Sequence, residues 1–152
     1  MTSPLRLCVR RSSDTREAAT LVTLRLPSDV NCIEEAVELV TRHCLAGSQA
    51  TPSTRFRLRV VLSEALTNAI VQGNREDHSK WVHVRAELGL EAIRVWVTDE
   101  GAGFNPEAVP EPTRPEQLDE ARGRGLYLIR KLVDTVQFNE QGNSICMTLR
   151  RL

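Results

Sequence analysis

Apolar and polar residues alternate in three parts of the chain, which is the pattern of strands with one buried face. The first part is residues 20–26, where the alternation stops before Pro27. Each of the other two parts contains two such segments separated by a short turn-like stretch, which predicts hairpins. The predicted hairpins pair residues 81–88 with 92–99 and residues 135–138 with 144–149.

Three further segments carry apolar residues at helical spacing. We expect Ser28 or Asp29 to cap the first of these helices, because either side chain can accept a hydrogen bond from a free N–H group of the first turn. The predicted helices run from that cap to about Gly47, from after residues 52–54 to Gly73, and from Gly125 to Val133.

Strands grouped in hairpins, with helices between the groups, predict an α+β fold. We expect a two-layer α/β sandwich in which the helices cover one face of a mixed, mostly antiparallel sheet. With 152 residues, the chain is expected to hold one domain at 19–152, preceded by an N-terminal extension or edge strand at 1–18. Four prolines within residues 104–122 predict a long loop, because proline disrupts helices and central strands.

Composition excludes several classes of protein. The formal net charge is zero with 26% charged residues, so the chain lacks the basic footprint of a nucleic-acid binder or a polybasic membrane anchor. No apolar run approaches the roughly 20 residues that span a bilayer. The four cysteines lack the spacing of a zinc or thioredoxin-like centre and are interpreted as reduced thiols. We therefore expect a cytoplasmic protein with no direct nucleic-acid or membrane partner.

Glu64 and Asn68 are four residues apart on the second predicted helix, so they lie on one helix face about 5–6 Å apart. A carboxylate can accept a proton or orient a nucleophile, and a carboxamide oxygen is a suitable ligand for Mg²⁺. The pair could therefore act on one ligand. A solvated polar stripe is the alternative explanation for these two residues taken alone.

Two glycine-containing segments follow the pair. The first segment, with Asp99, Gly101 and Gly103, comes directly after a predicted strand, where backbone without Cβ can bend sharply and approach a flat ligand. The carboxylate of Asp99 could accept hydrogen bonds from an exocyclic amine. Gly123 and Gly125 precede an apolar helix, whose free N–H groups suit phosphate oxygens. An ordinary turn and a flexible helix start are the alternatives.

The order of these segments resembles the GHKL (Bergerat-fold) ATPase superfamily over about residues 20–152. That superfamily includes gyrase, a heat-shock chaperone ATPase, histidine kinases and a mismatch-repair ATPase, and shares a histidine-kinase-like ATPase fold. Within it, the chain most resembles the bacterial anti-sigma-factor serine/threonine kinases. The segments that carry this resemblance are residues 63–69, 98–106 and 123–129.

The resemblance implies a role for each matching residue. It makes Glu64 the general base, Asn68 the Mg²⁺ ligand and Asp99 the acceptor of the adenine amine. Gly101 and Gly103 would shape the base pocket. The other implied nucleotide-binding residues are Gly123, Arg124, Gly125 and Leu126, at the phosphate end of a lid loop at about 104–122, and Asn74, close to the phosphates.

Two features depart from the family pattern. Gln72 stands where the family often has His, so a proton role at that position is in doubt. The lid segment is also rich in proline and acidic residues, which could slow its closure or change the affinity for nucleotide.

As a whole, the resemblance implies an ATP- and Mg²⁺-dependent anti-sigma regulatory factor with serine/threonine protein kinase activity. It would phosphorylate an anti-anti-sigma (STAS-type) protein, bind a sigma factor and form a homodimer. One alternative is a non-catalytic module that regulates its partner by ATP occupancy alone. Another is a protein that binds no nucleotide, in which the glycine segments are only turns.

Overall fold

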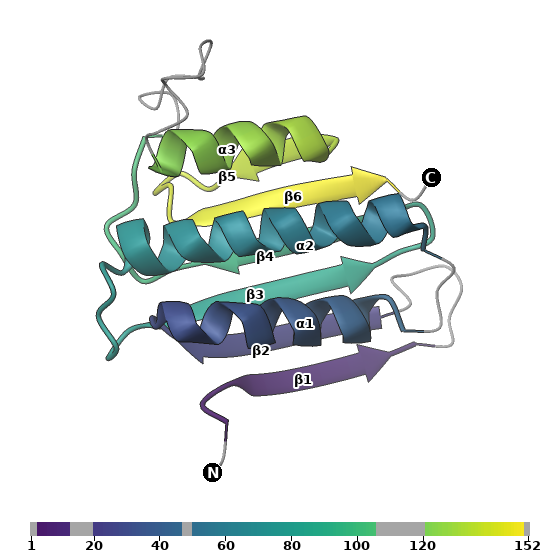
Figure 1. Ribbon diagram of the computed structural model, residues 1–152, viewed down its shortest axis with the longest axis horizontal. Helices are drawn as coiled ribbons and strands as arrows, with labels where there is room; N and C mark the ends of the chain where they lie inside the picture. The colour runs from purple at the N-terminus through teal and green to yellow at the C-terminus, as the bar shows by residue number, and fades with distance from the viewer. Residues whose placement is uncertain (1–2, 13–19, 47–49, 106–120, 151–152) are drawn as a thin grey trace.

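In the part of the chain that the structure describes, three α-helices lie on one face of a single six-stranded sheet (Figure 1). The computed structural model describes residues 3–12, 20–46, 50–105 and 121–150. The strands are β1 (Arg6–Arg11), β2 (Thr20–Pro27), β3 (Trp81–Leu88), β4 (Ala92–Thr98), β5 (Thr135–Phe138) and β6 (Ser144–Arg150). The helices are α1 (Ile33–Cys44), α2 (Pro52–Thr67) and α3 (Ala121–Leu132), together with a 3₁₀ turn, η1 (Val30–Cys32), and a π-helical turn, η2 (Asn68–Gly73).

The sheet confirms the predicted fold class. Its strand order is β1-β2-β3-β4-β6-β5, and all five described pairings are antiparallel. Both predicted hairpins are present, and β6 also pairs with β4, which joins the second hairpin to the rest of the sheet. The strand predicted at 20–26 is β2, which pairs with β3 on one side and with β1 at the edge on the other.

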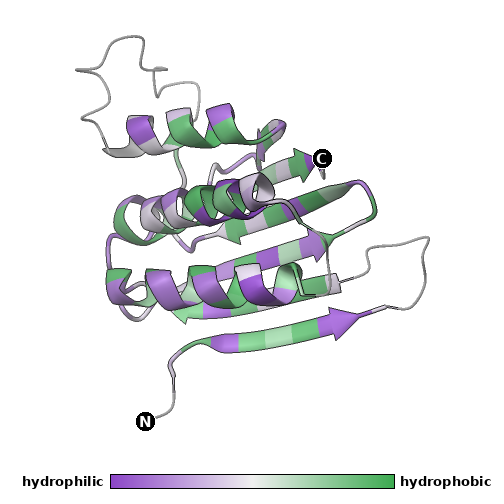
Figure 2. Cartoon of the chain, turned by 45° about the vertical axis from the view of Figure 1, so that its right-hand side comes forward, coloured by the Kyte–Doolittle hydropathy of each residue, from purple (hydrophilic) through white to green (hydrophobic). Residues whose placement is uncertain are grey.

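The core lies between the sheet and the helices. Strands β2 and β3 bury alternate residues, visible as alternating hydropathy bands in Figure 2. Their inward side chains pack with the apolar stripes of α1 and α2 to form one cluster. Its most completely buried members include Leu26, Leu58, Leu62, Leu66 and Ile93. Because burial follows a period of two in strands and about 3.6 in helices, the sequence pattern specifies which face each element buries.

Helix starts follow local capping chemistry. The Asp29 side chain accepts a hydrogen bond from the N–H of Asn31, so it caps η1, which leads into α1. Thr51 caps α2 by accepting from the N–H of Thr54 at 3.1 Å, and Pro52 occupies the first helical position, where its missing N–H has no cost. Helix α2 therefore begins at Pro52, slightly before its predicted start.

One predicted boundary was wrong. Helix α3 begins at Ala121 and not at Gly125, so the second glycine segment lies inside the helix. Most of the predicted lid loop, residues 106–120, lies outside the described residues. In the described part of the chain, no helix has both the length and the apolar character needed to cross a membrane.

Candidate active site

Glu64 lies in the last turns of α2, and Asn68 is the first residue of the π-helical turn η2 that continues it. In this turn the N–H of Asn74 donates to the carbonyl of Ala69 at 2.8 Å, five residues earlier. Single π-helical turns are rare and occur frequently at functional sites, because they change the direction of the following side chains. Here the turn directs the chain from α2 toward the loop that carries Asp99.

Helix α3 contacts the end of α2 and the start of η2 at a glycine. A Cβ added to Gly125 would lie 3.0 Å from Glu64 Oε2 and 3.1 Å from Asn68 Nδ2, which is tighter than ordinary packing. The structure therefore brings together Glu64, Asn68 and Gly125, which are separated by up to 61 residues in the sequence. Gly125 is needed here for space and not for an unusual backbone angle.

The loop after β4 lies close against the end of η2, and two more glycines, Gly73 and Gly101, leave the space for this contact. The N–H of Gly101 donates to Asp99 Oδ1 at 2.8 Å, which fixes the direction of the carboxylate. A Cβ on Gly73 would overlap the Asp99 carboxylate, and a Cβ on Gly101 would overlap the backbone carbonyl of Gly73. Gly73 is a site residue that the sequence analysis missed; its position next to Gln72 was the available signal.

The same loop also interlocks with the β5–β6 turn. Gly103 has φ +85° and Gly142 has φ +73°, a region that residues with a side chain rarely adopt. A Cβ on Gly103 would overlap the carbonyl of Gln141, and a Cβ on Gly142 would overlap the carbonyl of Phe104. The predicted base-pocket loop is thus confined by backbone on both sides.

Two small cavities lie beside Asp99. One of about 30 Å³ is lined by Asn68, Asp99, Leu126 and the rings of Phe104 and Phe138, which meet edge to face at 5.5 Å between centroids. The other, of about 60 Å³, is lined by residues that include Gly73, Arg75, Asp99 and Gly103. The first has about the volume of one water molecule in liquid. A purine base can therefore enter only if side chains such as Phe104 move.

Asn74 is buried, with 1% of its surface exposed, and its side chain contacts three other segments. Its Nδ2 donates to Ser28 Oγ at 2.8 Å and to the carbonyl of Trp81 at 3.0 Å. Its Oδ1 accepts from the N–H of Glu100 at 2.8 Å. The carboxamide thus ties the end of η2 to Ser28 just after β2, to β3 and to the Asp99 loop, so these bonds position the site from within the protein.

Glu64 also faces a groove between α1 and α2. The groove has a volume of about 640 Å³ and is lined by residues that include Val30, Phe56, Arg59 and Glu64. Phe56 is 60% exposed and Val30 is 41% exposed, so the groove offers apolar surface beside a carboxylate. This arrangement leaves Glu64 accessible from outside the two cavities beside Asp99.

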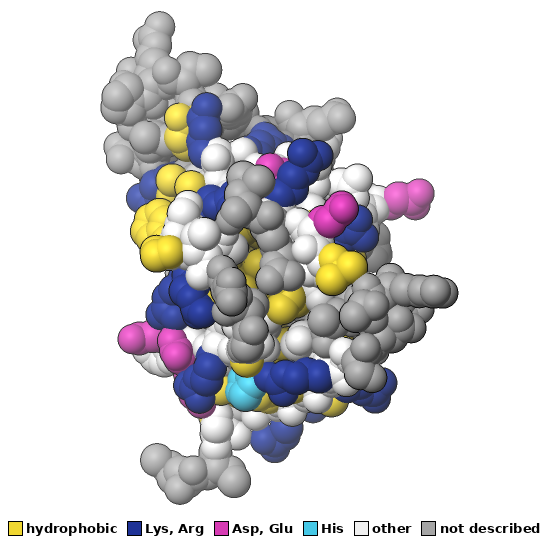
Figure 3. Space-filling view, turned by 90° about the vertical axis from the view of Figure 1, so that its right-hand side faces the viewer, with side chains coloured by type: hydrophobic (Ala, Val, Ile, Leu, Met, Phe, Trp, Pro, Cys, Tyr) yellow, Lys and Arg dark blue, Asp and Glu magenta, His cyan; other side chains and the backbone are white. Residues whose placement is uncertain are grey.

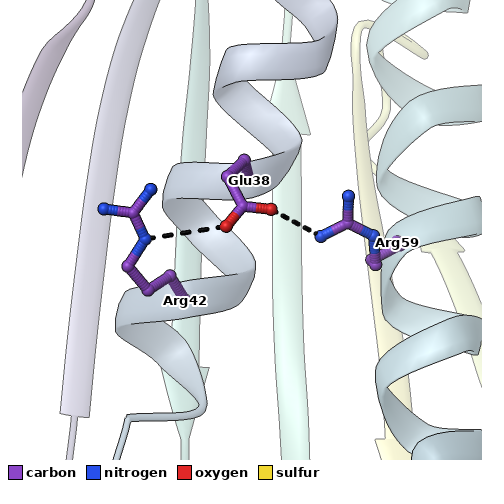
Figure 4. A network of polar contacts seen from close by, with 3 residues as sticks. All are labelled: Glu38, Arg42 and Arg59. Carbon is purple, nitrogen blue, oxygen red and sulfur yellow. Dashed lines mark hydrogen bonds and ion pairs between the residues drawn. The ribbon is translucent and has the colours of Figure 1, made fainter.

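Charged residues connect the two helices that form the groove (Figure 4). Glu38 on α1 accepts a hydrogen bond from Arg59 on α2 at 2.8 Å and forms an ion pair with Arg42 at 3.6 Å. The hydrogen bond from Arg59 is the main reason that the pKa of the Glu38 carboxyl is lowered. All three side chains are largely exposed, so this network orients the edge of the groove more than it stabilises the fold.

The remaining predicted residues have different positions. Leu126 is buried and lines the smaller cavity, Gly123 is buried in the first turn of α3, and Arg124 is exposed. No group of three or more His, Cys, Asp or Glu residues that could hold a metal occurs among the described residues. A Mg²⁺ ion bound by the Asn68 carboxamide oxygen would therefore take its other ligands from substrate phosphates and water, as Mg²⁺ commonly does.

This combination of an antiparallel sheet covered by helices, a Glu–Asn pair and an Asp–Gly loop agrees with the comparison with known proteins. The histidine kinase-like ATPase domain family matches residues 26–149, which is most of the chain. The protein belongs to this family.

Similar curated proteins are bacterial kinases. The serine-protein kinase RsbW of Bacillus subtilis is 33% identical over 99 residues, which cover 60% of this chain and 61% of that protein. RsbW of Oceanobacillus iheyensis is 31% identical over 90 residues, covering 55% and 57%, respectively. RsbW of Staphylococcus aureus is 25% identical over 135 residues, covering 84% of each. The chain thus spans about three fifths of the first two relatives and most of the third.

Proposed function

We propose that the protein is an ATP-binding anti-sigma regulatory factor that transfers the γ-phosphoryl group of ATP to a serine or threonine of an anti-anti-sigma (STAS-type) partner. The observation that carries this proposal is the position of Glu64. It lies beside Asn68 and Gly125 on one side and lines an open groove on the other. A hydroxyl presented by a partner protein in the groove would meet Glu64 next to the phosphates.

The base and the phosphates of the nucleotide would bind at opposite ends of the site. Asp99, held by Gly101 and enclosed by Gly73, would accept from the adenine amine. The phosphates would lie between Asn68 and the start of α3, where the first helical turn has N–H groups without intrahelical acceptors. Gly123 is in that turn. The exposed Arg124 would add positive charge nearby.

Transfer of the phosphoryl group then requires a group that accepts the hydroxyl proton, one bond to phosphorus that forms and one that breaks. Glu64 would take the proton of the partner hydroxyl while the hydroxyl oxygen forms a bond to the γ-phosphorus of ATP. The bond between the γ-phosphorus and the oxygen that bridges it to the β-phosphorus would break at the same time, which releases ADP. Mg²⁺ supplies neutralisation of phosphate charge, and Asn68 is the residue that would hold it. The main contribution of the protein is positioning, which agrees with the close packing of Glu64, Asn68 and Gly125.

Glu64→Gln tests the catalytic role. The variant keeps the shape of the side chain but cannot accept a proton, so we expect at least a 100-fold loss of label transfer from γ-labelled ATP to a purified STAS-type protein, with ATP binding retained in calorimetry. Glu91→Gln, at an exposed position between β3 and β4, is the matched control. Equal transfer by the wild type and Glu64→Gln would exclude Glu64 as the base. ATP binding without any transfer by the wild type would favour regulation by occupancy alone.

The predicted partners need a separate experiment. We propose that a sigma factor and the STAS-type protein compete for this chain, and that the chain forms a homodimer. Co-purification from the native cell with and without ATP should recover these partners in different proportions. Light scattering of the purified protein should give twice the mass of one chain, and a monomer at all concentrations would contradict the dimer.

A further inference from the structure

The sheet face opposite the helices is not covered by any other described segment (Figure 1). Strand β3 directs Trp81, His83, Arg85 and Glu87 to this face, because its alternate residues Val82, Val84, Ala86 and Leu88 are buried on the helix side. A hollow of about 780 Å³ extends across four neighbouring strands of the face. Its lining includes Arg6, Arg25, His83, Arg85, Arg94 and Trp96.

The hollow has an excess of positive charge. Glu87 is the acidic residue among those that line it, and its carboxylate is already paired with Arg85 at 2.6 Å. Arg6 lies directly opposite Arg25 in the sheet register, and Arg25 lies opposite His83. Like charges in directly opposed positions destabilise a sheet. The fold therefore leaves cationic groups side by side on this face, and the single carboxylate of Glu87, which pairs with Arg85, is outnumbered by the four arginines of the lining.

Two of these arginines are stacked on the tryptophans. The Arg25 guanidinium carbon lies 4.2 Å from the centroid of the Trp81 ring, and that of Arg85 lies 5.5 Å from Trp96. Stacking holds the Arg25 guanidinium group against a ring face and leaves its N–H edges available to a bidentate anion, whereas the Nε and Nη2 groups of Arg85 already donate to Glu87 Oε1 at 3.1 Å and 2.6 Å. Because these side chains are ordered before a ligand arrives, less conformational entropy is lost on binding.

We propose that this face, defined by Arg6, Arg25, Arg85 and Arg94 with the two tryptophans, binds an extended acidic segment of a partner protein. Charge complementarity favours this occupant, because carboxylates form paired hydrogen bonds with guanidinium groups. Three strand spacings separate β1 from β4, or roughly 14 Å, which about five extended residues can span. Alternate residues of such a segment face one side, so alternating acidic residues match the surface.

Other occupants fit the face less well. A second copy related by a two-fold axis would bring two faces with the same excess of positive charge together. The guanidinium groups already cover ring faces that would have to stack with bases in single-stranded nucleic acid. Lys and Arg side chains are also visible at the end of the molecule shown in Figure 3, but there they are interspersed with Asp and Glu side chains.

Intrinsic fluorescence gives a direct test, because Trp81 and Trp96 are the two tryptophans of the chain and both lie on this face. A decapeptide of alternating Glu and Gly is titrated into the full chain at low salt, with a Gln/Gly peptide for comparison. We expect a saturable change with the Glu peptide alone. The double variant Arg25→Gln/Arg85→Gln should raise the midpoint at least tenfold, and Arg55→Gln, an exposed change on α2, should leave it unchanged.

Several results would overturn the proposal. These are an unchanged tryptophan fluorescence at 1 mM Glu peptide, an equal fluorescence change with both peptides, or a binding midpoint of the double variant equal to that of the wild type. Tighter binding of a dT15 oligonucleotide, or self-association that the double variant abolishes, would assign the face to a different occupant. If the double variant does not fold, judged by circular dichroism, Arg94→Gln is used in its place. Label transfer by the double variant is measured separately, because the proposal does not depend on the kinase activity.

Discussion

At the scale of single residues, Asn74 shows how one buried polar side chain can hold several segments of a candidate site together. Its carboxamide uses both the donor and the acceptor ends, and its three partners come from the residue after β2, from β3 and from the Asp99 loop. The sequence placed Asn74 near the phosphates through a family resemblance. The structural contacts could not be predicted, because they depend on segments that are up to 46 residues away.

Asn74→Ala should therefore destabilise the protein and weaken nucleotide binding together. The change leaves the N–H of Glu100 and the carbonyl of Trp81 without their present partner, and each buried polar group that stays unpaired costs about 1–3 kcal/mol. Urea unfolding should show the loss, and calorimetry should show reduced ATP affinity. Asn31→Ala, at an exposed position of η1, is the control. Equal stability of Asn74→Ala and the wild type would contradict the positioning role.

Gly125→Ala should separate stability from activity. Alanine favours a helix over glycine by about 1 kcal/mol, so the free energy of unfolding should stay the same or rise. The new Cβ would press on the ends of Glu64 and Asn68, and displacements of this kind in an active site reduce rates strongly. We expect at least tenfold slower label transfer. Gly89→Ala, in the β3–β4 turn, is the control. A Gly125→Ala variant with full activity would show that this contact is not needed for transfer.

At the scale of elements, the strands were predictable and the helix ends were less so. Strands β2, β3 and β4 bury alternate residues, and this produces a strict alternation in the sequence. The π-helical turn η2 has no comparable pattern, because it differs from an α-helix in hydrogen-bond register and not in residue type. The start of α3 was missed because Gly123 and Gly125 suggested a boundary, whereas both lie inside the helix and Gly125 provides space there for packing against α2.

The start of α2 can be tested through its cap. Thr51 Oγ1 accepts the N–H of Thr54, which otherwise has no intrahelical acceptor. Thr51→Ala should lower the free energy of unfolding by about 1 kcal/mol, and Thr51→Ser should retain most of the stability. Ser53→Ala, in the exposed first turn, is the control. Chemical denaturation measures all three, and an unaffected Thr51→Ala variant would show that solvent replaces this cap.

At the scale of the whole molecule, the site is assembled from elements that are distant in sequence. Asp99 follows β4, Asn68 follows α2, Leu126 belongs to α3, and Phe138 ends β5, yet all of them line one small cavity. Asn68, Asp99 and Leu126 of this set could be selected from the sequence, because they lie in the segments that carry the resemblance to a known ATPase family. The aromatic residues Phe104 and Phe138 could not, since apolar residues give no sign of which cavity they line.

A ligand that joins these elements should stabilise the whole fold. At a concentration of 100 times its Kd, a ligand of the native state adds about 2.7 kcal/mol, which raises the Tm of a protein of this size by roughly 5–10 °C. We expect ATP with Mg²⁺ to produce this shift. GTP should produce a smaller one, because its base presents a carbonyl oxygen where adenine has an amine, and the Asp99 carboxylate repels it.

Asp99→Asn tests the selectivity for ATP over GTP at the contact between the side chain of residue 99 and the exocyclic amine of adenine. The new side chain can still accept from the N–H of Gly101 with its carbonyl oxygen, so the loop should keep its conformation. Its amide group would then meet the adenine amine donor to donor. We expect at least a tenfold loss of ATP affinity, equivalent to about 1.4 kcal/mol, and a correspondingly smaller thermal shift. Glu140→Gln, in the exposed β5–β6 turn, should behave as the wild type. An equal ATP shift in Asp99→Asn and the wild type would place the base elsewhere.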